Sequence, residues 1–263
     1  MQSVRATLNC VGVNTTNDIS ILGHMFGFIR RRVPTDPDSS VTAEVSMLDY
    51  VQRVANDYTN LNVIRVGFDA LSTQAEADGL HKIDYCIYRI RNIYRPVGVS
   101  VGRVLHYVLS AADANGGDDI GSENEADELS DDWSAPTSGI DCFMVRNISD
   151  PDFVGISPRP GSCDKPSKRD GLIAGEIERA AADDLDFELV ARTFAHEVGH
   201  FLGLPHNHDD GDCPGSAAGR RNLMAQTGCV TNNGVAANIR AAVQLSNNQG
   251  NTMDDHCSIR SGC

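Results

Sequence analysis

The sequence of 263 residues predicts an α/β fold in which helices pack on a sheet. Short apolar segments typical of strands alternate with two longer segments of helical periodicity, at 76–95 and 187–202. The composition, 41% hydrophobic and 22% charged, is ordinary for a globular protein. The chain is also long enough to bury a sizeable core, as one large domain or two small ones.

The first 60 residues have the least regular pattern. We predict strands at 4–13 and 26–32 and a turn-rich loop at 33–40. Residues 41–58 have mixed periodicity, and we favour a helix there.

A clearer pattern begins at residue 62. One face of the helix predicted over 76–95 is apolar, and Pro96 ends that helix. The residues of this face are Leu80, Ile83, Ile87, Ile90 and Tyr94. Alternation or β-branched content predicts strands at 62–68, 99–109, 140–145, 153–157 and 172–177.

The net charge of −14 argues against nucleic-acid or anionic-membrane partners, because both are bound chiefly through Lys and Arg. No apolar run approaches the ~20 residues that span a bilayer. Surplus carboxylates could instead hold Ca²⁺, at the acidic segment 113–132 or at Asp209, Asp210 and Asp212. The first segment lacks EF-hand spacing, so we favour a solvated loop with a short helix at 122–133.

The eight cysteines are even in number, scattered and without a CxxC pair, which predicts disulfides and an oxidising compartment. Eight cysteines allow 105 pairings, so Cys213–Cys229 and Cys257–Cys263 are local expectations only. Buried thiols in a cytosolic protein are the alternative. The first residues lack the apolar core of a signal peptide, so secretion would require a signal that was removed or replaced by Met1.

The helix predicted over 187–202 has the strongest signal in the chain. Asp186 is a candidate N-cap, and Gly203 can end the helix in the left-handed conformation. The apolar stripe consists of Phe187, Val190, Phe194, Val198 and Phe201. A second helix of this half is predicted at 235–245.

The segment that begins at His196 reads H-E-V-G-H-F-L-G-L-P-H. His196 and His200, four apart on one helix face, can reach a single metal ion, and the break at Gly203 lets His206 join them. Three imidazoles leave a fourth position for water, as catalytic zinc sites do. Glu197, beside the first ligand, is then placed to act as general base on a metal-activated water. His208 could serve as a substitute ligand, but we favour an ordinary loop residue.

These residues resemble the signature of the metzincin clan of zinc endopeptidases, H-E-x-x-H-x-x-G-x-x-H followed by a Met-turn. The match is complete at His196, Glu197, His200, Gly203 and His206, and Met224 is the candidate methionine beneath the zinc. Asn207 after the third histidine and Gln226 after the methionine depart from the well-known families. The resemblance therefore extends to the clan and not to one family.

The metzincin-like fold implied by this resemblance is a twisted, mixed five-stranded sheet with two long helices, followed by a smaller irregular C-terminal subdomain with one helix. It divides the chain into an N-terminal catalytic subdomain at 61–203 and a C-terminal subdomain at 204–263, which carries His206 and Met224. Segment 153–157 would be the antiparallel edge strand that pairs with substrate. Residues 1–60 lie outside the resemblance, as an extension that contains strands and has an open role.

We therefore predict a secreted zinc-dependent endopeptidase whose partner is a peptide or protein substrate, with an open oligomeric state. One alternative is a highly selective or latent peptidase. Another is a binding or adhesion module that retains zinc but lacks activity. That module would require the loss of Glu197 or of a ligand, and neither is lost.

Overall fold

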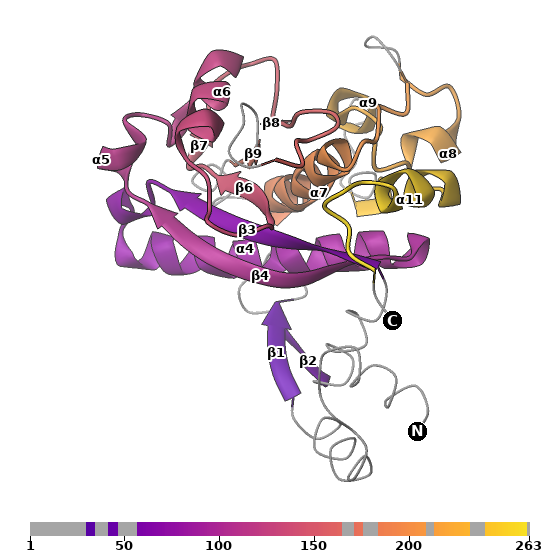
Figure 1. Ribbon diagram of the computed structural model, residues 1–263, viewed down its shortest axis with the longest axis horizontal. Helices are drawn as coiled ribbons and strands as arrows, with labels where there is room; N and C mark the ends of the chain where they lie inside the picture. Colours follow the sequence, from indigo (N-terminus) through magenta and orange to yellow (C-terminus); the bar gives the residue numbers. More distant parts are fainter. Residues whose placement is uncertain are drawn as a thin grey trace.

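The computed structural model describes residues 30–34, 42–46, 57–164, 171–175, 184–208, 213–231 and 240–261. A five-stranded sheet in the order β4-β3-β6-β9-β8 forms its centre (Figure 1). The first four strands pair in parallel, and β8 is antiparallel to β9 at the edge. The strands are β3 (Asp57–Val66), β4 (Val99–Leu109), β6 (Ile140–Met144), β8 (Gly155–Ile156) and β9 (Gly171–Ala174). The predicted α/β fold with a mixed, mostly parallel five-stranded sheet is confirmed.

Two long helices cover one face of this sheet. Helix α4 (Thr73–Tyr94) and helix α7 (Asp184–Phe201) share a hydrophobic core cluster with residues of β3, β4, β6 and β9. Helix α6 (Glu123–Asp132), capped by Ser122, packs on the other face (Figure 1). The strands alternate accordingly: Cys142 and Met144 of β6 face α4 and α7, whereas Phe143 belongs to the cluster with α6.

Polar contacts also join the two long helices. The hydroxyl of Tyr85 donates to Glu188, whose other carboxylate oxygen lies 2.5 Å from Nη2 of Arg89. Closer to the end of α7, the hydroxyl of Tyr94 donates to the carbonyl oxygen of Ala195 at 2.6 Å. Side chains of α4 thus bond to α7 at two positions, Glu188 and Ala195. Ala195 directly precedes His196.

The remaining elements are short. Strands β1 (Arg30–Pro34) and β2 (Thr42–Ser46) pair antiparallel, whereas β5 (Asp119–Ile120) and β7 (Asn147–Ile148) pair in parallel. The other helices and 3-10 turns are η1 (Phe68–Ala70), η2 (Arg95–Val97), α5 (Ala111–Ala114), α8 (Ala217–Arg220), α9 (Thr227–Thr231) and α11 (Asn247–Asp254).

Three local predictions are wrong. Residues 42–46 form a strand and not a helix, in keeping with their β-branched Thr42 and Val45. Helix α7 begins at Asp184, so Asp186 lies inside the helix and is not its N-cap. Residues 242–245 are not helical, and Gln244 instead forms a β-bridge with Asn222. The predicted strand at 4–13 and the first five residues of the helix predicted over 235–245 lie outside the described residues.

The described C-terminal part therefore contains α8, α9 and α11 where one helix was predicted. Helix α11 has no apolar face to detect, since its sequence is NNQGNTMD. It starts at a capping box, in which Ser246 accepts from the backbone of Gln249 while the Gln249 side chain accepts from the backbone of Ser246.

Two disulfides are described. Cys213–Cys229 is present as predicted, but Cys257 pairs with Cys163 and so not with Cys263. The loop after β8 returns to the C-terminal segment, where the carbonyl oxygen of Gly161 accepts from His256 at 3.2 Å, and this proximity makes the long-range pair possible. Cys86 and Cys142 are buried thiols in the core. Among the described residues, no helix combines the length and the apolar character that a membrane crossing requires.

Candidate metal centre

Three imidazoles meet at the C-terminal end of α7. His196 and His200 lie four residues apart on that helix, and both are buried. His206 follows in the next loop and is half-buried. One ring nitrogen of each histidine lies within 4.8 Å of the other two, and the Nε2 atoms of His200 and His206 are 3.1 Å apart. The structure thus brings the three predicted ligands together.

The chain turns back toward the helix end at Gly203. Its φ of 97° lies in the left-handed region, which glycine adopts without the steric cost that other residues incur. The amide of Leu204 donates to the carbonyl oxygen of Gly199 at 2.9 Å and closes the last helical turn. This reversal lets His206 lie opposite His200 after a short loop.

Backbone carbonyls set the tautomers of both helical histidines. Nδ1 of His196 lies 2.8 Å from the carbonyl oxygen of Leu223, and Nδ1 of His200 lies 2.7 Å from that of Leu204. A carbonyl oxygen can only accept, so each Nδ1 carries the proton and each Nε2 keeps its lone pair. Metal-binding histidines are oriented in this way, with the second ring nitrogen donating to an oxygen.

Burial also keeps the imidazoles of His196 and His200 neutral. It lowers the pKa of His196 well below the usual range, and the neighbouring His200 adds to that effect. Burial likewise lowers the pKa of His200 to about 4, against a smaller opposite effect of the hydrogen bond to Leu204. Both rings are therefore uncharged at neutral pH, as nitrogen ligands must be.

Glu197 follows His196, the first histidine of this cluster, on α7. It is 5% exposed, and burial raises its pKa to about 8, against the opposing charge of Arg192. A Cβ added to Gly155 of β8 would be 3.0 Å from Cγ of Glu197, so the backbone of the edge strand runs against this side chain. The side chain of Glu197 is thus enclosed between α7 and the edge strand β8.

The turn at 222–225 bonds to His196 and contacts residues that neighbour His200 and His206 in the chain. Leu223 accepts from His196, and the amide of Asn207, next to His206, donates to the carbonyl oxygen of Met224 at 2.8 Å. A Cβ at Gly199 would lie 2.9 Å from Sδ of Met224. The methionine predicted to lie below the site therefore packs against the residue before His200, where an added Cβ would require a shift of its side chain.

Other candidate ligands are not part of this group. His208 is exposed and lies outside the cluster of three histidines, while Asp209, Asp210 and Asp212 lie outside the described residues. Within the described ranges, the second cluster of metal-ligating side chains is Cys163, His256 and Cys257. Its two sulfurs are joined in a disulfide, and neither cluster contains carboxylates, so no described group supports a calcium site.

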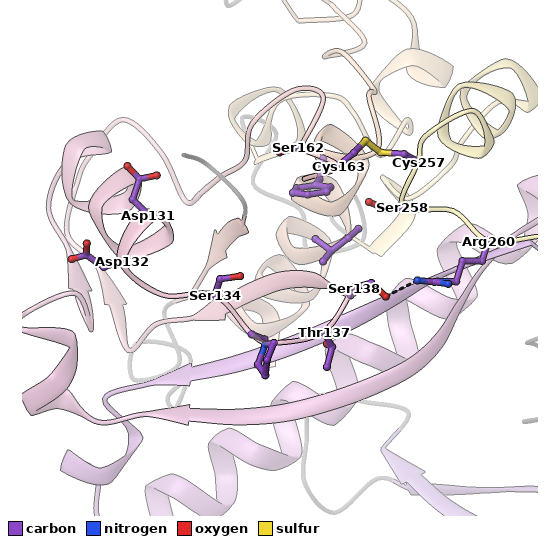
Figure 2. Close-up of a pocket in the computed structure, with 15 residues that line it drawn as sticks. Asp131, Asp132, Ser134, Thr137, Ser138, Ser162, Cys163, Cys257, Ser258 and Arg260 are labelled. Carbon is purple, nitrogen blue, oxygen red and sulfur yellow. Dashed lines mark hydrogen bonds between the residues drawn. A yellow bond between two sulfur atoms is a disulfide. The ribbon is translucent and has the colours of Figure 1, made fainter. Parts of the chain in front are cut away.

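A cleft of about 880 Å³ lies apart from the imidazoles (Figure 2). It is lined by residues 131–132 and 134–140, the loop at 162–163, Phe201, and Cys257, Ser258 and Arg260 of the C-terminal segment. The disulfide Cys163–Cys257 and a hydrogen bond of 2.5 Å from Arg260 to Ser138 form part of its wall (Figure 2). Neither Glu197 nor any of the three histidines lines this cleft, so the imidazoles define the candidate site and the cleft is separate from it.

The sequence prediction did not include Arg192, which is buried one turn before His196 and bonded to the turn at 222–225. The available signal was its position, as a charged residue four before the first histidine among apolar residues of the same helix. Its acceptors are carbonyl oxygens more than 30 residues away, and side-chain patterning gives no information about such partners.

Comparison with known proteins finds similarity among solved structures. No protein-family model matches the sequence, and no curated protein matches it. Among solved structures, the chain is similar to an archaemetzincin from Methanopyrus kandleri, with 14% identity and a TM-score of 0.45 over 75% of this chain and 94% of that one. It is also similar to metalloproteinase-II from Bacteroides fragilis, with 13% identity and a TM-score of 0.46 over 94% of this chain and 59% of that one. Likeness at this level establishes neither a family nor an activity, so the functional argument rests on the residues of the site.

Proposed function

We propose that this chain is a secreted zinc-dependent endopeptidase. The observation that carries the proposal is the cluster of His196, His200 and His206, with ring nitrogens within 4.8 Å of one another, beside the buried Glu197. The disulfides Cys163–Cys257 and Cys213–Cys229 support an oxidising location, where such bonds persist.

The donor set fits zinc. Three imidazoles are a ligand set of catalytic zinc sites, whereas Ca²⁺ and Mg²⁺ require oxygen ligands. Two of these imidazoles, those of His196 and His200, have Nδ1 tied to a carbonyl oxygen. When bound, zinc would supply Lewis-acid chemistry, polarising a scissile carbonyl and lowering the pKa of water. His196, His200 and His206 are the residues that would hold it.

Glu197 is the proposed general base. Its carboxylate would accept the proton of the attacking water and later deliver it to the leaving amine. Burial alone favours its protonated form, as the raised pKa of about 8 indicates, and a divalent cation nearby would favour the carboxylate. Glu197 would therefore be a carboxylate, able to accept a proton, only in the metal-loaded protein.

The edge strand β8 is the proposed docking site for substrate. It pairs with β9 on one side only among the described strands, and Gly155 lies against Glu197. An extended peptide that adds to this edge would gain backbone hydrogen bonds and run directly past the general base. This placement favours a peptide or protein substrate over a small molecule.

The test combines zinc content with hydrolysis of a quenched, unstructured protein, for wild type and Glu197→Gln, with and without a chelator. We expect one zinc per chain in both proteins, activity only in wild type without chelator, and a loss in kcat of about 10²–10⁴-fold in the variant. Retained activity in Glu197→Gln would contradict the assigned role of Glu197. Zinc binding without hydrolysis of any general substrate would instead indicate a selective or latent peptidase, or a binding module.

A further inference from the structure

Arg192 is the largest side chain among the fully buried residues that the structure describes, with 1% of its surface exposed. It lies on α7 four residues before His196 and therefore on the same helix face. Among the described residues, three backbone carbonyl oxygens accept from its guanidinium. Nε donates to Ala242 at 2.9 Å, and Nη2 donates to Leu223 at 2.8 Å and to Ala225 at 2.5 Å.

Two of these acceptors flank Met224. The carbonyl oxygen of Leu223 also accepts from Nδ1 of His196, at 2.8 Å. One oxygen thus receives a proton donor from Arg192 and another from a predicted metal ligand. Any movement of Leu223 changes the bond that orients the imidazole of His196.

Packing alone does not explain an arginine at this position. An apolar side chain could fill the volume, but the carbonyl oxygens of Ala225 and Ala242 would lose a charge-assisted donor in a buried place. A lysine keeps the charge, yet it offers one compact ammonium in place of a planar fork that reaches segments 223–225 and 242 at once. The positions of the carbonyl oxygens at 223, 225 and 242 therefore favour the guanidinium of arginine.

We propose that Arg192 is a positioning residue of the metal centre: it fixes the turn at 222–225 and thereby the ring orientation of His196 and the place of Met224 beneath Gly199. The inference rests on the proposed function for the identity of the metal. The hydrogen bonds that carry it, however, join atoms of the chain alone. Partners of this kind, one step removed from the metal, typically change metal affinity 10–100-fold when they are removed.

Arg91 provides a matched control. It is also a buried arginine on a long helix, and it donates to backbone carbonyl oxygens, those of Val101 and Gly102, at 3.2 and 3.0 Å. These acceptors lie on β4, far along the chain from the histidines. Arg91→Lys and Arg192→Lys therefore remove the same kind of contact from two different places.

The experiment measures both variants and wild type as full chains. Zinc affinity is taken from competition with a chromophoric chelator, and the tautomer of His196 from imidazole ¹⁵N shifts of the metal-free protein. We expect Arg192→Lys to bind zinc about 10–100-fold more weakly and to lose the pure Nδ1–H state of His196, with Arg91→Lys like wild type in both. Equal zinc affinity and equal ¹⁵N shifts in the two variants would overturn the proposal.

The tautomer measurement separates this proposal from the function. If wild type bound no zinc, the proposed function would fail, while the ¹⁵N shifts would still report on Arg192. Should Arg192→Lys not fold, Arg192→Ala with added methylguanidinium replaces it. Restoration of the His196 tautomer by this cation supports the positioning role, and a folded protein without restoration refutes it.

Discussion

Helices α4 and α7 pack side by side on the same face of the sheet, yet they use their buried polar groups differently. Three buried polar side chains of α4 bond to other protein groups: Tyr85 to Glu188, Tyr94 to the carbonyl oxygen of Ala195, and Arg91 to two carbonyl oxygens of β4. On α7, His196 and His200 use Nδ1 for the protein and direct Nε2 toward the neighbouring imidazoles.

Within one layer of helices, the polar side chains of α4 thus stabilise the fold, whereas the histidines of α7 can bind a ligand through one ring nitrogen. A buried polar group costs free energy unless it is bonded, and α4 meets that cost with contacts that hold the structure together. Helix α7 uses half of each imidazole in this way and keeps the other half for a ligand. A buried side chain that is satisfied on one side only, and converges with others like it, indicates a site.

This contrast between the two helices would be wrong if the three imidazoles only stabilised the fold. Replacing His206 by Ala tests this, because His206 is half-buried and lies in a loop. We expect zinc affinity to fall by more than about 100-fold, since loss of a ligand costs more than loss of a ligand's hydrogen-bond partner. The metal-free protein should unfold at the same urea concentration as wild type. A large loss of stability with unchanged zinc affinity would assign His206 to the scaffold.

The supporting role of α4 predicts the opposite result for Tyr85→Phe. Glu188 is 1% exposed and loses one of its donors, so the free energy of unfolding should fall by about 1–3 kcal/mol while zinc affinity stays unchanged. Urea titration and the chelator assay measure the two quantities. A variant that binds zinc more weakly would show that α4 also tunes the site.

The same tyrosine predicts an alkaline limit to stability. Burial raises the pKa of Tyr85 above its ordinary value, and the hydrogen bond to Glu188 acts in the same direction. The folded chain thus keeps a proton that the unfolded chain loses above about pH 10. Stability from this group is complete below that pH and falls as pH rises, so Tyr85→Phe should flatten the fall in a pH series of urea titrations.

The smallest expected effects come from the glycines that follow the two helices. Gly98, after α4 and η2, and Gly203, after α7, have φ of 84° and 97°, and a Cβ would meet no close contact at either. Alanine at each should cost about 1 kcal/mol of stability through backbone strain alone. Only Gly203→Ala should also weaken zinc binding, because Leu204 and His206 follow it. Equal zinc affinities would show that the loop adapts.

The sequence predicted what local patterning controls. The apolar stripes located α4 and α7, and the spacing of His196, His200 and His206 indicated that they converge. The β-forming residues of β4 gave its bounds, Val99–Leu109, without error. Cys213–Cys229 was within reach because the two residues are 16 apart.

What patterning could not show depends on contacts between distant segments. Cys163 and Cys257 are 94 residues apart, and the acceptors of Arg192 at 223, 225 and 242 are set by how the chain returns under α7. Helix α11 has a polar sequence and is fixed by its cap and by the contact of Asn222 with Gln249, so it has no periodic signal.

The shared carbonyl oxygen of Leu223 also limits what can be transplanted. A peptide that contained only α7 and the loop to His206 would carry every residue of the histidine signature, yet it would lack the acceptor that orients His196 and the sulfur that lies beneath Gly199. Grafting the signature onto another scaffold would therefore reproduce its spacing without its geometry. A graft would have to include at least the stretch from Arg192 to Ala242, because the side chain of Arg192 donates to the carbonyl oxygen of Ala242.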